Sequence, residues 1–294
     1  MQTTAWSSPL TRKLSVFIEL DGHERAVLAD LEADTEHVRQ GTELVSRGEP
    51  IERAQVVRDG WAVRSKTLPD GRRQIIDFVL PGNLIGLYAH VSPVAEETVT
   101  ALTPMITAPF DPDRMLQLFT DHPRLASSLA WMGAREDQIL AERLVSMGRR
   151  SAYERLAHIF LELWERLRIR GLAGNGRLPI PLTQSTLADA LGLSVVHVNR
   201  TLSQLARAGL VEVKKRERML VILDHQRLRD AAGFDGDYLL HRQIPSRLSR
   251  SLAELEQAPA AQRGAVPEAA AVSANAVRAE GAQGAAGANH SKPK

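Results

Sequence analysis

Residues 182–206, which read LTQSTLADALGLSVVHVNRTLSQLA, narrow the possible folds of this chain more than any other segment. Their apolar spacing predicts a first helix over residues 185–191 with one buried face. That face consists of Leu187, Ala188 and Leu191. Gly192 follows, where a left-handed backbone costs glycine little, and Ser194 is a natural N-cap for a second helix. These separations are typical of a helix-turn-helix.

The second predicted helix divides into a buried side and an outward side. The buried side consists of Val198, Leu202 and Leu205. The outward side consists of Val195, Val196, His197, Asn199 and Arg200. An ordinary helical hairpin also uses a glycine turn and apolar stripes, so this segment by itself leaves that alternative open.

The sequence that follows favours the DNA-binding interpretation. Residues 211–223, VEVKKRERMLVIL, alternate at both ends and carry a basic centre, which predicts a two-stranded hairpin or wing. A charge run is commonly a solvated surface. Next to a recognition helix, however, the basic residues Lys214, Lys215 and Arg216 are well suited to contact phosphates of double-stranded DNA.

Composition excludes several classes of protein. The formal net charge of the 294-residue chain is only +2, so basic clusters at residues 149–150, 166–170 and the wing matter more than the total. There are no cysteines, which excludes disulfides and cysteine-ligated zinc, haem or iron–sulfur centres. Residues 1–9 lack a signal-peptide core and no apolar run could span a bilayer, so we expect a cytoplasmic protein without membrane contact.

The chain divides into five predicted parts. Short strand-like runs between Leu14 and Pro109, separated by turns such as Asp59-Gly60, predict a sandwich or jelly-roll barrel. The predicted parts are a lead-in at residues 1–20, a barrel at 21–110, a linking helix at 111–148, a winged helix-turn-helix at 149–232, and an extension at 233–294 that is largely disordered beyond 259.

Two long helices are predicted after the barrel, over residues 123–147 and 153–168. The first carries an apolar seam, for which both intrachain packing and pairing with a second copy are open; we assign it to dimerisation. The seam consists of Leu125, Leu129, Met132 and Ile139. Leu140 and Leu144 are expected to face the helix's own barrel.

An α+β chain with a barrel, a long helix and a winged helix-turn-helix, in that order, resembles the Crp/Fnr family of bacterial transcription regulators. The resemblance covers about residues 38–230 and includes GTELVSRGE at 41–49, DGWAVRSK at 59–66 and LPGNLIG at 80–86. Each motif is weak by itself, and their order and spacing carry the assignment. The resemblance implies a homodimer that reads a palindromic site with two recognition helices, and RNA polymerase as a further partner.

The resemblance also assigns roles in DNA contact. Three residues would face base edges: Val196, Asn199 and Arg200. Others would contact phosphates or flank the site: Thr183, Gln184, Ser185, Ser194, Val195, His197, Lys214, Lys215 and Arg216. Arg200 matches the arginine that reads guanine in the family, and a guanidinium can donate two hydrogen bonds to guanine O6 and N7. Contact of Arg200 with phosphate alone is the alternative.

Val196 departs from the family pattern, since many relatives carry a glutamate that accepts a hydrogen bond from cytosine. Valine can accept nothing, but it can contact a thymine methyl group. We therefore expect a half-site that differs at this base pair.

The predicted effector pocket is degenerate. Its matching positions are Gly86, Leu87, Glu97 and Thr98. Cyclic-nucleotide-binding relatives use a glutamate for the ribose where this chain has Leu87, and an arginine for the phosphate where it has Glu97. A carboxylate repels a phosphate, and leucine cannot hold a ribose hydroxyl. We expect no cofactor: no cyclic nucleotide at the usual site and no iron–sulfur cluster.

Two alternatives have weaker support. A haem-sensing or other small-molecule-sensing regulator would rely on histidines such as His23, His37 and His90, but scattered single histidines are more typical of ordinary positions. A cupin-like metalloenzyme would need converging ligands, and the strand region has no His-x-His, so we predict no metal site and no enzyme activity. A sensor that acts through protein contacts without binding DNA also stays open.

Overall fold

The computed structural model describes residues 8–89 and 92–239. Within them, the barrel consists of two four-stranded antiparallel sheets, as the predicted fold class requires. One sheet has the order β1 (Glu36–Val38), β8 (Met105–Phe110), β3 (Ala54–Asp59) and β6 (Leu84–Ile85). The other has the order β2 (Glu43–Val45), β7 (Thr98–Ala101), β4 (Ala62–Thr67) and β5 (Arg73–Val79).

The barrel interior follows from strand periodicity. In β7, Val99 and Ala101 are buried while Thr98 and Thr100, which alternate with them, are less so, as expected for one inward face. The end of β5 breaks this alternation, because Phe78 and Val79 are both buried. Val79 belongs to the barrel interior, whereas Phe78 packs outward under the helices. This strand is therefore covered on both faces.

Two helices precede the barrel where the sequence predicts strand-rich chain from Leu14 onward. Helices α1 (Pro9–Leu14) and α2 (Gly22–Leu31) pack against β3, β8 and the long helix α4 (Pro123–Arg149). The local sequence signal for α2 is a capping box. The Asp21 carboxylate accepts from the Glu24 backbone amide, and the Glu24 carboxylate accepts from the Asp21 backbone amide. Residues 1–7 of the predicted lead-in lie outside the described part of the chain.

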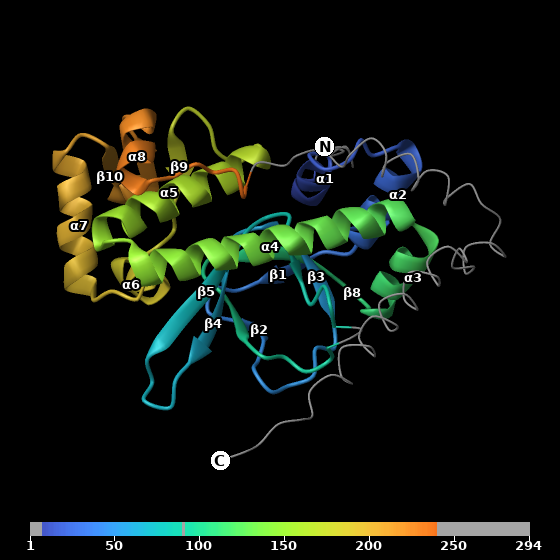
Figure 1. The fold of residues 1–294 in the computed structure, drawn as a ribbon. Helices are drawn as coiled ribbons and strands as arrows, with labels where there is room; N and C mark the ends of the chain where they lie inside the picture. The colour runs from blue at the N-terminus through green and yellow to red at the C-terminus, as the bar shows by residue number, and fades with distance from the viewer. Residues whose placement is uncertain (1–7, 90–91, 240–294) are drawn as a thin grey trace, which may run out of the picture.

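Helix α4 runs along the whole molecule, from α3 (Asp113–Asp121) beside the barrel to the far end (Figure 1). Its predicted length is confirmed, but the predicted dimer seam is wrong. Leu125, Leu129, Met132 and Ile139 are all buried in cores of their own chain. Leu144, expected to face the barrel, is 69% exposed. The sequence prediction assigned the inward and outward sides of α4 the wrong way round. Both stripes have helical spacing, and only packing decides which one faces inward.

The C-terminal domain contains the predicted helix-turn-helix and hairpin. Its helices are α5 (Ala152–Ile169), α6 (Gln184–Leu191), α7 (Val195–Arg207) and α8 (His225–Ala232). Its sheet has the order β10 (Val211–Lys214), β11 (Met219–Ile222) and β9 (Arg177–Pro179), with a short 3-10 turn, η2 (Lys215–Glu217), at the hairpin tip. Strand β9 was not predicted; it is a short segment that forms by pairing with β11.

The barrel and the C-terminal domain share one apolar core. Trp61, Ile75 and Phe78 of the barrel pack in the same cluster as α5 residues such as Phe160 and Leu163. Helix α6 also contacts β5, where the Arg73 guanidinium pairs with Asp189 at 2.8 Å. The helix-turn-helix is therefore docked against the barrel.

The chain after α8 does not leave the domain at residue 233, where the extension was predicted to begin. Phe234 and Leu239 are buried, and the Tyr238 ring stacks on His158 of α5 with centroids 6.0 Å apart. The Arg135 guanidinium of α4 donates to the Tyr238 carbonyl at 3.1 Å. This segment therefore ties the C-terminal domain to α4. The tail that we predict to be disordered beyond 259 lies outside the described residues.

Acid sensitivity should reveal the burial of His158. Burial lowers the pKa of His158 to about 4, so the folded protein holds a neutral ring while the unfolded chain titrates near its ordinary value. The unfolded state then binds the extra proton below about pH 6.5, and stability falls with falling pH. Acidification from about pH 7.5 to 5 should cost the native protein about 2 kcal/mol more than it costs His158→Gln.

Denaturant unfolding at both pH values measures this difference. His37→Gln, at an exposed position on β1, is the matched control and should behave like the native protein. Equal pH dependence of His158→Gln and the native protein would contradict a buried neutral His158.

Candidate nucleic-acid interface and barrel cavity

Local hydrogen bonds define the predicted helix-turn-helix, with the predicted cap at Ser194 and a cap at Thr183 that was not predicted. The Thr183 hydroxyl caps α6 by accepting from the Thr186 amide at 3.0 Å, and the Ser194 hydroxyl caps α7 by accepting from the His197 amide at 3.2 Å. Between them, Gly192 has a φ of +64°, in the left-handed region. Both capping hydroxyls therefore accept a hydrogen bond from the backbone of the motif itself. The exposed Ser194 hydroxyl can still donate its proton to a phosphate.

Helix α7 presents the predicted outward face to solvent. Val198 and Leu205 are buried under it, and Thr201 joins them in place of the half-buried Leu202. The exposed side chains are Val195, Val196, Asn199 and Arg200, with His197 partly covered. Val196 is 76% exposed, which costs free energy unless an apolar surface covers it.

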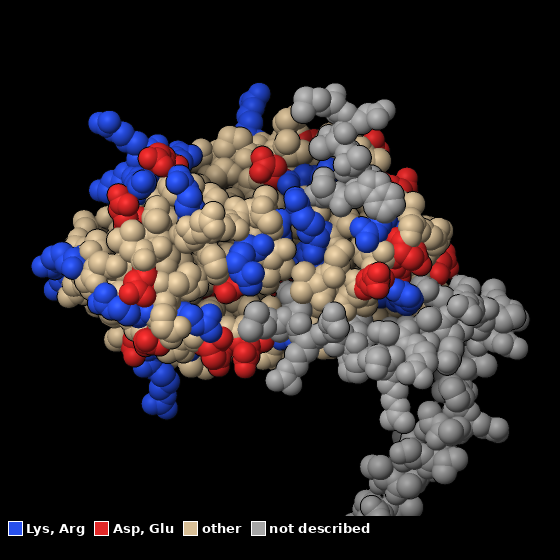
Figure 2. All heavy atoms as spheres, turned by 90° about the horizontal axis from the view of Figure 1, so that it is seen from above, with Lys and Arg blue, Asp and Glu red and all other residues tan. Residues whose placement is uncertain are grey.

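The wing adds positive charge beside α7. Lys215 and Arg216 are exposed on η2, and Lys214 is half-buried at the end of β10. Gln184 and Ser185 lie in the first turn of α6, where free backbone amides favour an anion. Figure 2 shows lysine and arginine side chains projecting at the left end of the molecule, the end that carries α7 and the wing in Figure 1.

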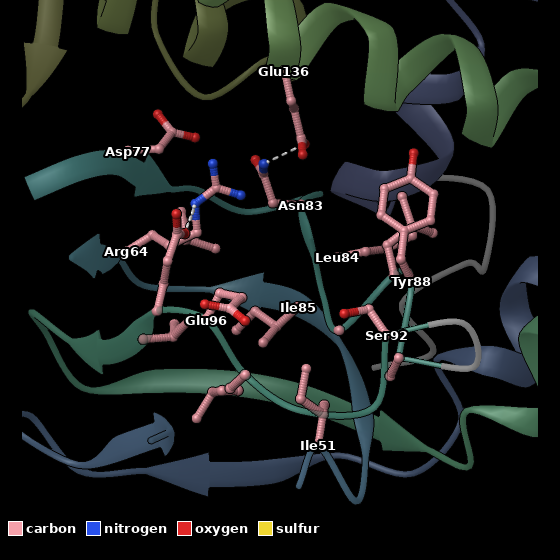
Figure 3. A pocket seen from close by; sticks show the side chains of 18 of the residues that line it. Ile51, Arg64, Asp77, Asn83, Leu84, Ile85, Tyr88, Ser92, Glu96 and Glu136 are labelled. Atoms are coloured by element: carbon pink, nitrogen blue, oxygen red, sulfur yellow. Dashed lines mark hydrogen bonds and ion pairs between the residues drawn. The ribbon is translucent and has the colours of Figure 1, made fainter. Parts of the chain in front are cut away.

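A cavity of about 310 Å³ lies in the barrel below α4 (Figure 3). Gly86, Leu87 and Glu97 line it as predicted, but Thr98 does not. The Thr98 hydroxyl instead accepts from the backbone amide of Arg47, in the turn after β2, at 3.4 Å.

The charges in this cavity were largely missed by sequence reasoning. Four carboxylates line it: Asp77, Glu96, Glu97 and Glu136. Of the described lining residues, Arg64 alone is cationic, and its Nε atom lies 2.8 Å from the Glu97 carboxylate. Arg64 and Glu97 are far apart in sequence and come together only because β4 pairs with β7.

Glu136 connects the cavity to three helices. Its carboxylate reaches down from α4 and accepts from the Asn83 amide at 2.9 Å (Figure 3). The Lys13 ammonium of α1 donates to the same oxygen at 3.3 Å. Burial lowers the pKa of Lys13 to about 7, although Glu136 opposes that shift. Asn83 in turn accepts from Arg170 at the end of α5, at 2.9 Å.

The two described histidines among those considered for haem lie away from the cavity lining. His23 packs against His122 at the α2–α3 corner, with ring centroids 5.2 Å apart, and His37 is exposed on β1. His90 lies outside the described residues. Across residues 8–89 and 92–239, no three metal-ligating side chains converge. The helices described in this range include none that is long and apolar enough to cross a membrane.

Known proteins share both halves of this architecture. Residues 35–122 match the cyclic nucleotide-binding domain family, and residues 154–231 match the Crp-like helix-turn-helix domain family. The nitrogen fixation regulation protein FixK of Rhizobium meliloti is 30% identical, over 60% of this chain and 77% of that protein. The transcriptional activator protein FnrL of Cereibacter sphaeroides is 28% identical, over 77% and 91%. The structure of FixK2 from Bradyrhizobium japonicum superposes with a TM-score of 0.61 at 29% identity, over 67% of this chain and 96% of that one.

Proposed function

Because this chain belongs to the Crp/Fnr family of transcription regulators, we propose that it binds a palindromic DNA site as a homodimer. The observation that carries the proposal is the solvent-exposed face of α7 beside a basic wing. A helix of this size fits the major groove, and the wing supplies phosphate contacts. The relatives are regulators rather than enzymes, and we propose no catalytic role.

Sequence selectivity is assigned to Arg200 and Val196. Arg200 is exposed, and no described carboxylate pairs with it, so its guanidinium is available for a guanine edge. In this proposal Val196 covers a thymine methyl group, and its 76% exposure supports the assignment, because such a contact would remove that apolar surface from water. Asn199 lies on the same face and can bond an adjacent base.

Selection of binding sites from a random DNA pool tests these assignments. We expect a palindrome whose half-site differs, at the Val196 position, from that of glutamate-bearing relatives. Arg200→Ala should weaken binding by about 1–3 kcal/mol and relax the preference at one guanine.

Arg207→Ala is the matched control, because Arg207 is exposed on the same helix but lies in its last turn and donates to the Ser203 carbonyl. It should leave the selected sequence unchanged. Uniform weakening by Arg200→Ala across all sequences would identify a phosphate contact instead. Recovery of the glutamate-type half-site would refute the role of Val196.

The dimer interface is assigned to the exposed side of α4. This side carries Ala130, Ala134, Ala141 and Leu144 at coiled-coil spacing, with the exposed Asp137 at the position between Ala134 and Ala141, and Val145 beside the stripe. Alanines let two helices approach closely, and pairing would cover the exposed Leu144. This stripe replaces the seam predicted from the sequence, which is occupied within the chain.

Leu144→Glu should convert the dimer into a monomer, because each copy would place a carboxylate in an apolar seam. Analytical ultracentrifugation measures the change, and affinity for the palindrome should fall with it. Leu116→Glu is the control, since Leu116 is an exposed leucine on α3 outside the stripe. A Leu144→Glu protein that stays dimeric would place the interface elsewhere.

We also propose that the barrel cavity takes no cyclic nucleotide in the usual way. The Glu97 carboxylate repels a phosphate and already engages the one described lining arginine, Arg64. Leu87 offers nothing to a ribose hydroxyl. No haem is proposed, since neither His23 nor His37 lines the cavity.

Calorimetry with cyclic AMP and with cyclic GMP should show no saturable heat. The same preparation must bind its selected DNA palindrome, so that inactive protein cannot explain the result. Micromolar binding of either nucleotide would contradict this assignment of the cavity.

RNA polymerase is the proposed protein partner, because relatives such as FnrL are named transcriptional activators. DNA binding also favours a cytoplasmic location, where the bacterial chromosome lies. An effector other than a cyclic nucleotide is compatible with the cavity and its mixed apolar and acidic lining.

A further inference from the structure

A buried cluster of four charged side chains joins the barrel to the DNA-binding domain. We call it the Asp77 cluster; its members are Asp77 of β5, Arg143 of α4, and Glu162 and Arg166 of α5. We propose that the Asp77 cluster fixes the orientation of the helix-turn-helix on the barrel and thereby sets the half-site spacing that the dimer accepts. The spacing part of this inference rests on the proposed function.

The geometry of the Asp77 cluster is highly directional. Arg166 donates to both Asp77 oxygens, at 2.8 and 3.2 Å, and to the Phe78 carbonyl at 2.8 Å. Arg143 donates to the Ile76 carbonyl and to Glu162, each at 2.8 Å. A bidentate guanidinium–carboxylate pair fixes angle as well as distance. Three separate elements are thereby held in one relative orientation.

The charges of the Asp77 cluster balance at a buried position. Two guanidinium groups face two carboxylates, and all four side chains are at most 10% exposed. Burial opposes ionisation of Asp77, but Arg166 and Arg143 outweigh it and hold the pKa of that carboxyl well below its usual range. Asp77 is therefore ionised at any pH at which the protein works.

Stability alone does not account for such a cluster. Removing ions from water is costly, and apolar residues of similar volume often stabilise a buried site as well or better. The apolar core that Phe78 shares with Phe160 and Leu163 already holds the two domains together. Those contacts are non-directional. The ion pairs add what the apolar core lacks, which is a single allowed angle between the DNA-binding domain and the barrel.

A second polar link lies on the same helix. Arg170, near the end of α5, donates to the Asn83 side chain at 2.9 Å, and Asn83 donates to Glu136 of α4 at 2.9 Å. Helix α5 is thus fixed at Arg166 and again one turn later at Arg170. Two fixed points along one helix prevent rotation of the domain about either of them.

The orientation of the helix-turn-helix matters because half-site spacing is geometric. In a dimer paired through α4, the separation of the two copies of α7 depends on the angle between each DNA-binding domain and α4. Two recognition helices must lie about one duplex turn, roughly 34 Å, apart to enter successive major grooves. A dimer in which this angle is fixed accepts one half-site spacing, whereas a dimer in which the angle varies accepts several.

The test replaces the interdomain pair by apolar residues, Asp77→Leu with Arg166→Met, and leaves Arg143 and Glu162 paired with each other. The first measurement needs no DNA. The chain has no cysteines, so Ser203→Cys on α7 and Gln117→Cys on α3 take spin labels at two chosen, exposed positions. Labelled protein is diluted into unlabelled protein, and the distance distribution is measured by pulsed electron resonance.

We expect one narrow distribution without the pair replacement and a broad one with it. The control is Glu36→Gln with Arg53→Met, which removes an exposed ion pair of 2.9 Å within the barrel and should leave the distribution narrow. Thermal unfolding verifies that each variant is folded, and Asp77→Asn serves as the milder variant if the double replacement does not fold. A narrow distribution in the folded variant would overturn the inference.

The second measurement uses palindromes whose half-sites are moved apart or together by one and two base pairs. The native protein should discriminate by about tenfold or more, since a misplaced half-site loses contacts worth at least that factor. The Asp77→Leu, Arg166→Met protein should discriminate less than about threefold while keeping its half-site sequence. Loss of sequence preference together with spacing preference would indicate structural damage and overturn the positioning role. If neither the native protein nor any variant binds a palindrome, the proposed function fails. The distance measurement still decides whether the Asp77 cluster fixes the orientation of the DNA-binding domain.

Discussion

The contact on which the rest of this structure depends is the burial of β5 between the barrel interior and helix α5. Val79 packs into the barrel and Phe78 into the core shared with Phe160 and Leu163. Fully burying each such side chain contributes about 1.5–3 kcal/mol. Because one strand supplies both cores, the barrel cannot shift without moving the surface on which the DNA-binding domain rests.

Helix α4 serves both the folded chain and its proposed pairing with a second copy. The face with Leu125, Leu129 and Met132 closes the barrel against α1 and α2, and the opposite face, which includes Leu144, is open. Glu136 lies between these faces and reaches into the cavity. Glu136 therefore brings α4 itself into the cavity lining, and two successive hydrogen bonds, through Asn83, connect it to Arg170 at the end of α5.

Electrostatics divides the molecule into two unlike surfaces. The exposed face of α7 and the wing carry unpaired cations and bare valines, which suit a polyanion with methyl groups in its groove. The cavity is lined by carboxylates around one paired arginine, which disfavours a phosphate. This difference supports the two proposals that phosphates are contacted outside and that none is bound within.

The sequence by itself determined the elements whose signals are local: the helix-turn-helix with its Thr183 and Ser194 caps and Gly192 turn, the basic hairpin, and the length of α4. Caps, turns and periodicity act over a few residues, so one chain segment contains all the information.

The tertiary structure decided which stripe of α4 is buried, because both stripes have the same spacing. It also decided the Arg64–Glu97 and Asp77–Arg166 pairs, whose partners lie on different elements, the second pair 89 residues apart. Strand pairing and domain docking bring such groups together, and no local pattern records which distant partner each one meets.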